Sequence, residues 1–115
     1  MNGKNFRRNA QAARHKRGAL VRALMNDPAI LFADEPTGSL NSAAGEAVLD
    51  LISDVNSGGQ SVVMVTHDVK SALRGNRILY SKDGLICGEC DLPQYTAKDA
   101  ARHDKLRSFL VEMGW

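Results

Sequence analysis

Residues Ile30–Glu35 read Ile-Leu-Phe-Ala-Asp-Glu, a short apolar run that ends in two acids. Such a run is typical of a strand that is buried on both faces of a parallel sheet. A second run, Ser61–Thr66, is rich in β-branched residues, and His67 follows it directly. Neighbouring parallel strands bring their carboxyl ends to one edge of the sheet, where open α/β folds bind ligands. The two runs therefore predict that the acids and His67 lie together.

Helical segments are predicted around these strands. Residues 9–25 are dominated by Ala, Arg, Leu and Lys, and Pro28 disfavours helix in the residue before it. Asn41 or Ser42 can cap a helix that extends to about Asn56. Alternating helices and buried strands predict an α/β layered fold with a mostly parallel sheet.

The C-terminal part predicts a hairpin followed by a helix. An Asp-Gly pair at 83–84 separates the apolar runs Arg77–Ser81 and Leu85–Cys90, which is a strong hairpin pattern. A helix is predicted to start near Thr96 and to run to the C-terminus. Its apolar stripe consists of Leu106, Phe109, Leu110 and Met113.

Length and composition limit the class of protein. The chain has 115 residues, 43% hydrophobic and 24% charged, which predicts one ordinary globular domain and excludes a disordered chain. No apolar run approaches the roughly 18 residues of a membrane span, and no signal peptide is visible. With only two cysteines, a reducing cytoplasmic compartment is expected.

Basic charge is concentrated at the start of the chain. Seven of the 15 Lys and Arg lie in residues 1–26, which contain no acid, so the rest holds eight basic and 13 acidic residues. Such a segment can contact nucleic acid or an acidic membrane surface, or it can be a solvated helix face. Nucleic acid is not favoured, because no aromatic residue is interleaved after Phe6 and no recognition motif follows.

Three side chains at the predicted sheet edge suit phosphate chemistry. Asp34 offers the oxygen ligand that Mg²⁺ prefers, and Glu35 can polarise an attacking water. His67 can donate a hydrogen bond to a phosphate oxygen. The alternative is a strand followed by a solvated acidic turn.

In combination, these motifs resemble the ATPases of ATP-binding cassette (ABC) transporters. Ile30–Glu35 resembles their Walker B strand, Gly38–Asn41 their D-loop and His67 their switch histidine. Lys16–Leu24 resembles the helix that follows the family's signature motif. The resemblance covers residues 16–115, including the hairpin and the tail. It is closest to the subgroup that energises peptide, macrolide or lipoprotein exporters, and it leaves residues 1–15 as an atypical basic leader.

The resemblance implies a partial P-loop NTPase (RecA-like) fold over 1–115 that binds ATP and Mg²⁺. Glu35 and His67 are then the expected catalytic residues, and Asp34 is the expected metal ligand. Ser39 and Asn41 are expected to contact the nucleotide. The implied partners are the transmembrane permease subunit of an exporter and a second copy of the chain. The implied location is cytoplasmic, peripheral at the inner face of the cell membrane.

The sequence also departs from the family pattern. None of its 115 residues match the phosphate loop G-x-x-x-x-G-K-[ST], and the Q-loop is missing. Ala10–Arg14 read Ala-Gln-Ala-Ala-Arg where the family has L-S-G-G-Q, and Asn41 replaces the usual Asp. We therefore expect a truncated ATPase subunit that is weak or inactive alone. The alternatives are a non-catalytic remnant, and a basic-tailed module that binds nucleic acid or an acidic membrane surface.

The missing strand has a consequence for assembly. In the family, the phosphate-loop strand lies between the strand ending at His67 and the strand Arg77–Ser81. Without it, Ser61–Thr66 presents an unpaired edge, which is a template for pairing with another chain. The edge can pair with a second copy, the hairpin Arg77–Cys90 can exchange between chains, or the gap can close within one chain. Of these outcomes we expect a homodimer, because closure requires the connecting segment to repack.

Overall fold

The computed structural model describes residues 3–115 and has two compact units, Met1–His67 and Asp68–Trp115. Met1 and Asn2, the start of the expected basic leader, lie outside the described residues. The side chains of Ala10, Ala12 and Ala13 in the altered signature also lie outside them.

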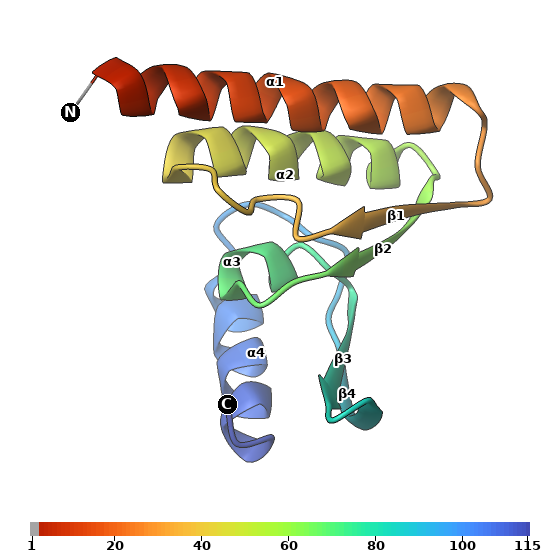
Figure 1. Ribbon diagram of the computed structural model, residues 1–115. Helices are drawn as coiled ribbons and strands as arrows, with labels where there is room; N and C mark the ends of the chain where they lie inside the picture. Colours follow the sequence, from red (N-terminus) through yellow and green to blue (C-terminus); the bar gives the residue numbers. More distant parts are fainter. Residues whose placement is uncertain (1–2) are drawn as a thin grey trace. The chain divides into compact units, whose positions relative to one another are not determined.

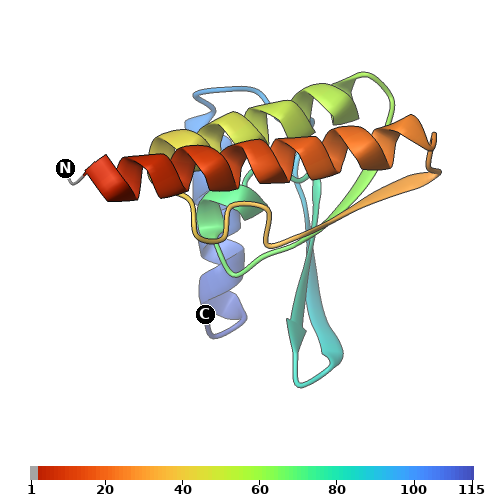
Figure 2. The same ribbon diagram turned by 45° about the horizontal axis from the view of Figure 1, so that its top comes forward.

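The first unit contains two helices and a two-stranded parallel sheet. Its elements are α1 (Gly3–Met25), β1 (Ile30–Asp34), α2 (Ser42–Ser57) and β2 (Ser61–Val65). The strands pair in register, with Phe32 opposite Val63. Helices α1 and α2 lie side by side in both views (Figures 1 and 2). Helix α1 begins six residues earlier than the sequence predicts.

The start of α2 is fixed by Asn41. The Asn41 side chain accepts a 2.8 Å hydrogen bond from the backbone N–H of Ala44, so Asn41, one of the two predicted caps, is the N-cap. Helix α2 then packs against the sheet through Val48 and Ile52, which contact buried Ala33. Leu20 of α1 joins the same cluster, so both helices contribute to one core.

The prediction that both strands are buried on both faces is wrong. Side chains alternate along β1, with Leu31 2% exposed and Phe32 62% exposed. In β2, Val63 is 46% exposed, whereas Val62 packs toward α2. The physical reason is that both helices of this unit pack on the same face of the sheet. The apolar sequences of the two strands therefore predict burial on both faces, although one face of the sheet carries exposed apolar side chains.

The second unit contains a short helix, an antiparallel hairpin and a C-terminal helix. Its elements are α3 (Val69–Ala72), β3 (Arg77–Lys82), β4 (Leu85–Asp91) and α4 (Ala100–Glu112). The hairpin is confirmed, and its turn residues Asp83 and Gly84 have φ of +54° and +79°. Positive φ at both positions is typical of a type I′ turn, which Asp-Gly adopts readily.

Helix α4 starts later than predicted, at Ala100 rather than near Thr96. Lys98 has a φ of +62°, which no right-handed helix tolerates, so the helix cannot include it. Asp99 is the N-cap and accepts a 3.2 Å hydrogen bond from the N–H of Arg102. The stripe expected on this helix is confirmed in part, because Leu106, Phe109 and Leu110 are buried with Cys90 and Leu92.

The α/β class is confirmed. Within residues 3–115, the strands form two sheets, a parallel pair β1–β2 and an antiparallel pair β3–β4. Over the described residues, no helix combines the length and the apolar character needed to cross a membrane.

Candidate functional site

Glu35 lies at the carboxyl end of β1, where the chain leaves the sheet. Its backbone N–H donates a 2.7 Å hydrogen bond to the carbonyl oxygen of Val65, the last residue of β2. The φ of Glu35 is +46°, a left-handed conformation that is uncommon for a residue with a side chain. The chain therefore turns sharply at this residue while remaining attached to the neighbouring strand.

The Glu35 carboxylate faces the residues that follow β2. Oε1 accepts a 2.9 Å hydrogen bond from the backbone N–H of His67. The imidazole Nε2 of His67 is 3.7 Å from the same oxygen, and Thr66 Oγ1 is 3.5 Å from Oε2. The His67 side chain is 91% exposed, so its imidazole remains open to a ligand from solvent. The structure thus brings Glu35 and His67 together, as the sequence predicts.

Asp34 is the last residue of β1 and is exposed, opposite Val65 in the strand register. Within residues 3–115, no three His, Cys, Asp or Glu side chains gather into a metal site. A single carboxylate still fits Mg²⁺, because this ion is commonly held by one or two carboxylates, water and substrate phosphates. The donor chemistry at the edge is therefore compatible with Mg²⁺ and not with an all-protein cage.

Ser39 and Asn41 lie on the turn that follows Glu35. Ser39 is exposed with a φ of +67°, and the N–H of Gly38 donates a 3.0 Å hydrogen bond back to the Glu35 carbonyl oxygen. The Asn41 side-chain oxygen caps α2. Their assignment to the nucleotide stays a prediction.

Sequence analysis missed two partners of Glu35. Lys16 Nζ donates a 3.0 Å hydrogen bond to the Glu35 carbonyl oxygen, and Thr66 reaches the carboxylate. The sequence does offer a signal for Thr66, because this hydroxyl residue directly precedes His67 at the end of the strand. No sequence pattern indicates Lys16, because its position over the turn depends on how α1 packs in the first unit.

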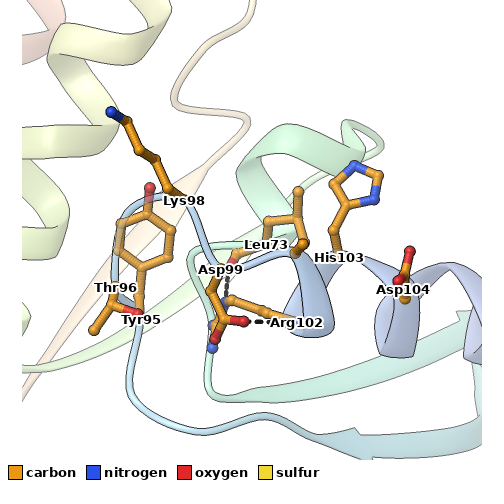
Figure 3. Close-up of a pocket in the computed structure, with 9 residues that line it drawn as sticks. Leu73, Tyr95, Thr96, Lys98, Asp99, Arg102, His103 and Asp104 are labelled. Atoms are coloured by element: carbon orange, nitrogen blue, oxygen red, sulfur yellow. Dashed lines mark hydrogen bonds between the residues drawn. The ribbon is translucent and has the colours of Figure 1, made fainter.

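A pocket of about 450 Å³ lies elsewhere, in the second unit (Figure 3). Lys98 and Tyr95 stand on one side of it and Leu73 and His103 on the other (Figure 3). The remaining lining residues are Thr96, Asp99, Ala100, Arg102 and Asp104. None of the side chains predicted for phosphate chemistry lines it.

Arg102 ties the wall of this pocket together and is only 3% exposed. Its Nε donates a 2.6 Å hydrogen bond to the carbonyl oxygen of Leu73, and its two terminal nitrogens donate to the carbonyls of Pro93 and Gly75. Burial lowers the pKa of Arg102 from its ordinary value, against the opposing charge of Asp99. The guanidinium is thus committed to the fold.

Comparison with known proteins relates the chain to one family, although no family model matches it. It is 50% identical over 74 residues to the lipoprotein-releasing system ATP-binding protein LolD of Aquifex aeolicus. It is 42% identical over 95 residues to the uncharacterized ABC transporter ATP-binding protein MJ0796 of Methanocaldococcus jannaschii. The chain is homologous to part of the ABC transporter ATP-binding proteins. The macrolide export ATP-binding/permease protein MacB of Rhodospirillum rubrum, 36% identical over 95 residues, extends the match to exporters.

The chain corresponds to only part of these ABC proteins. The matched part is 64% of this chain and 33% of LolD. For MJ0796 it is 82% of this chain and 34% of the relative, and for MacB it is 83% of this chain and 15% of the relative. The dimeric structure of a post-hydrolysis state of the MJ0796 cassette bound to ADP and Pi is 42% identical. It matches with a TM-score of 0.64 over 72% of this chain and 36% of that one. These likenesses confirm the partial P-loop NTPase fold predicted for the chain.

Proposed function

We propose that this chain forms part of the ATP-binding and ATP-hydrolysing subunit of an ABC exporter, and that Glu35 and His67 lie at its reacting centre. The observation that carries the proposal is the hydrogen bond between the His67 N–H and Glu35 Oε1, 2.9 Å. It joins the carboxyl ends of two parallel strands, the place where α/β folds bind their ligands.

Each residue has a role that its chemistry supports. The Glu35 carboxylate accepts a proton from an attacking water, which is general-base chemistry. The exposed imidazole of His67 donates a hydrogen bond to a phosphate oxygen. Ser39 and Asn41 contact nucleotide from the turn that follows Glu35. The side-chain oxygen of Asn41 also caps α2.

Asp34 is the proposed ligand of Mg²⁺. Its exposed carboxylate at the end of β1 suits an ion that is held mainly by water and by nucleotide phosphates. When bound, Mg²⁺ neutralises charge on the phosphates during transfer. Asp34 and Glu35 are adjacent in sequence, so one carboxylate is available for the ion and the other for water.

The 115 residues contain no phosphate loop, and this limits what they do alone. Such a loop supplies the backbone N–H groups and the lysine that hold the phosphates. We therefore propose weak nucleotide binding by the isolated chain. In the assembled exporter, the proposed partners are a permease subunit and a second copy of the chain at the cytoplasmic face of the membrane. The dimeric form of the solved MJ0796 cassettes supports the second copy.

Calorimetric titration with ATP, in the presence and absence of Mg²⁺, tests this proposal. We expect a dissociation constant of roughly millimolar or weaker, because each lost 1.4 kcal/mol of phosphate contact costs about tenfold in affinity. Binding should be stronger with Mg²⁺ in the wild type. Asp34→Asn should remove that difference, since an amide is a poorer ligand for the ion than a carboxylate.

Asp27→Asn is the matched control, because Asp27 is another exposed acid of the first unit and is not proposed to bind the ion. It should keep the Mg²⁺ dependence. Micromolar binding would contradict the assignment of a weak site. Binding that ignores Mg²⁺, or that responds equally in both Asn variants, would contradict the role of Asp34.

A further inference from the structure

The backbone carbonyl group of Glu35 is bonded both within its own turn and by a side chain of α1. Its oxygen accepts two hydrogen bonds of 3.0 Å, one from the N–H of Gly38 and one from the ammonium of Lys16. Gly38 belongs to the same turn, three residues on. Lys16 is 19 residues earlier, on α1, and its contact with the carbonyl is partly buried. The turn is therefore attached to a helix that is remote in sequence.

This contact acts on a residue whose backbone is unusual. Glu35 has a φ of +46°, which a residue with a Cβ adopts only when its surroundings favour it. The hydrogen bond from the Glu35 N–H to Val65 holds one side of the residue. Lys16 and Gly38 hold the other side through the carbonyl oxygen. A hydrogen bond from a charged donor is stronger than one from a neutral donor, so Lys16 supplies the stronger of the two.

The turn has little room for an alternative arrangement. A Cβ at Gly38 would lie 3.2 Å from the Glu35 carbonyl oxygen and 3.8 Å from Lys16 Nζ. The carbonyl, the glycine and the ammonium thus pack closely. The conformation that they fix is also the one that turns the Glu35 carboxylate toward the N–H of His67.

We propose that Lys16 is a positioning residue for Glu35. By holding the Glu35 carbonyl from α1, Lys16 keeps the carboxylate aimed at the end of β2. That this positioning assists ATP hydrolysis rests on the proposed function, in which Glu35 accepts a proton from water. The positioning itself is a property of the chain without nucleotide, so it can be tested even if ATP binding fails.

Amide hydrogen exchange measured by NMR tests the positioning. In Lys16→Met the exchange of the His67 amide should become about tenfold faster, the size expected for losing one hydrogen bond. The amide of Leu49, in the buried part of α2, should be unchanged. Lys16→Arg should restore slow exchange at His67, because a guanidinium can donate to the same carbonyl. Arg17→Met is the matched control, since Arg17 is the exposed neighbour on α1.

Three results would overturn the proposal. One is an unchanged His67 exchange rate in Lys16→Met. Another is equal acceleration at His67 and Leu49, which would mean that Lys16 supports the whole unit and not the turn. The third is a fast His67 amide in Lys16→Arg, which would mean that a cationic donor at this position is not what holds the carboxylate.

Discussion

The N–H of His67 and the carboxylate of Glu35 join the ends of β1 and β2, although the two residues are 32 positions apart in sequence. The 2.9 Å hydrogen bond uses one oxygen of the carboxylate and leaves the imidazole of His67 exposed. The hydrogen bond holds the carboxylate beside the end of β2, and a carboxylate placed there can accept a proton from an attacking water. The backbone after β2 therefore prepares Glu35 for the chemistry that we propose.

Replacing Glu35 by Gln separates chemistry from geometry. A Gln side chain still accepts a hydrogen bond from the His67 N–H, but it does not take a proton from water. We expect the isolated chain to hydrolyse ATP no faster than background, and any hydrolysis due to the chain to vanish in Glu35→Gln. A coupled phosphate-release assay measures this. Hydrolysis above background that is equal in wild type and variant would show that Glu35 has been assigned the wrong role or that a contaminant is responsible.

The residues that meet at this site could be predicted because they follow strands. Apolar runs that end in Asp34-Glu35 and in His67 specify both the strands and the edge where their ends meet. The exposure of one face of the β1–β2 sheet could not be predicted, because Phe32 and Leu31 are equally apolar. Only the packing of the helices decides that Leu31 is buried and Phe32 is exposed. Lys16 was missed for the same reason, since its partner is a backbone carbonyl that carries no sequence signal.

In the second unit, the turn was easier to predict than the helix start. Asp83-Gly84 suits positive φ at both positions, so the sequence determines the turn locally. Lys98 also has positive φ, but lysine has no preference for it, so the start of α4 could not be placed. Buried Arg102 was likewise invisible, because a basic residue on a helix normally predicts an exposed face.

Arg102 should be the most sensitive position of the second unit. Arg102→Met keeps an unbranched but shorter, apolar side chain, and it leaves the carbonyls of Leu73, Gly75 and Pro93 without this donor. We expect the free energy of unfolding to fall by about 3 kcal/mol, since the three acceptors are partly buried and each should cost about 1 kcal/mol when it loses its partner. Urea denaturation followed by circular dichroism measures the change. Arg107→Met, an exposed position on the same helix, should cost less than about 0.5 kcal/mol.

The Arg77–Glu89 pair on the hairpin predicts a specific pH response. A 2.6 Å hydrogen bond from Arg77 Nε, together with its charge, lowers the pKa of Glu89 below its ordinary value. A carboxylate with a lowered pKa stabilises the fold above its unfolded pKa, and this contribution is lost as the pH falls through the folded pKa. In Arg77→Gln, the pKa of Glu89 should therefore rise toward its ordinary value, as measured by NMR titration of the side-chain carboxyl carbon.

Lys82→Gln is the control for this titration, because it removes a positive charge from the same strand but leaves the Arg77–Glu89 hydrogen bond intact. The pKa of Glu89 should stay lowered in that variant. An equal rise in both variants would mean that general charge on the hairpin, and not the hydrogen bond, sets the pKa. Both side chains are exposed, so the pair should contribute little to overall stability.

Association of the chain should depend on the exposed face of the parallel sheet. Phe32 and Val63 lie opposite each other in the register and are 62% and 46% exposed. A two-stranded sheet leaves its outer edges without strand partners over the described residues, and parallel sheets are normally covered on both faces. We predict a homodimer in which this face or edge is buried.

Val63→Lys should raise the dissociation constant of this homodimer at least tenfold, or about 1.4 kcal/mol, because burying an unpaired ammonium is unfavourable. Leu85→Lys, at a 70% exposed position on the hairpin, should leave the constant unchanged. Light scattering across a concentration series measures the association. A monomer at every concentration would contradict the dimer, and equal weakening by both lysine variants would place the contact elsewhere.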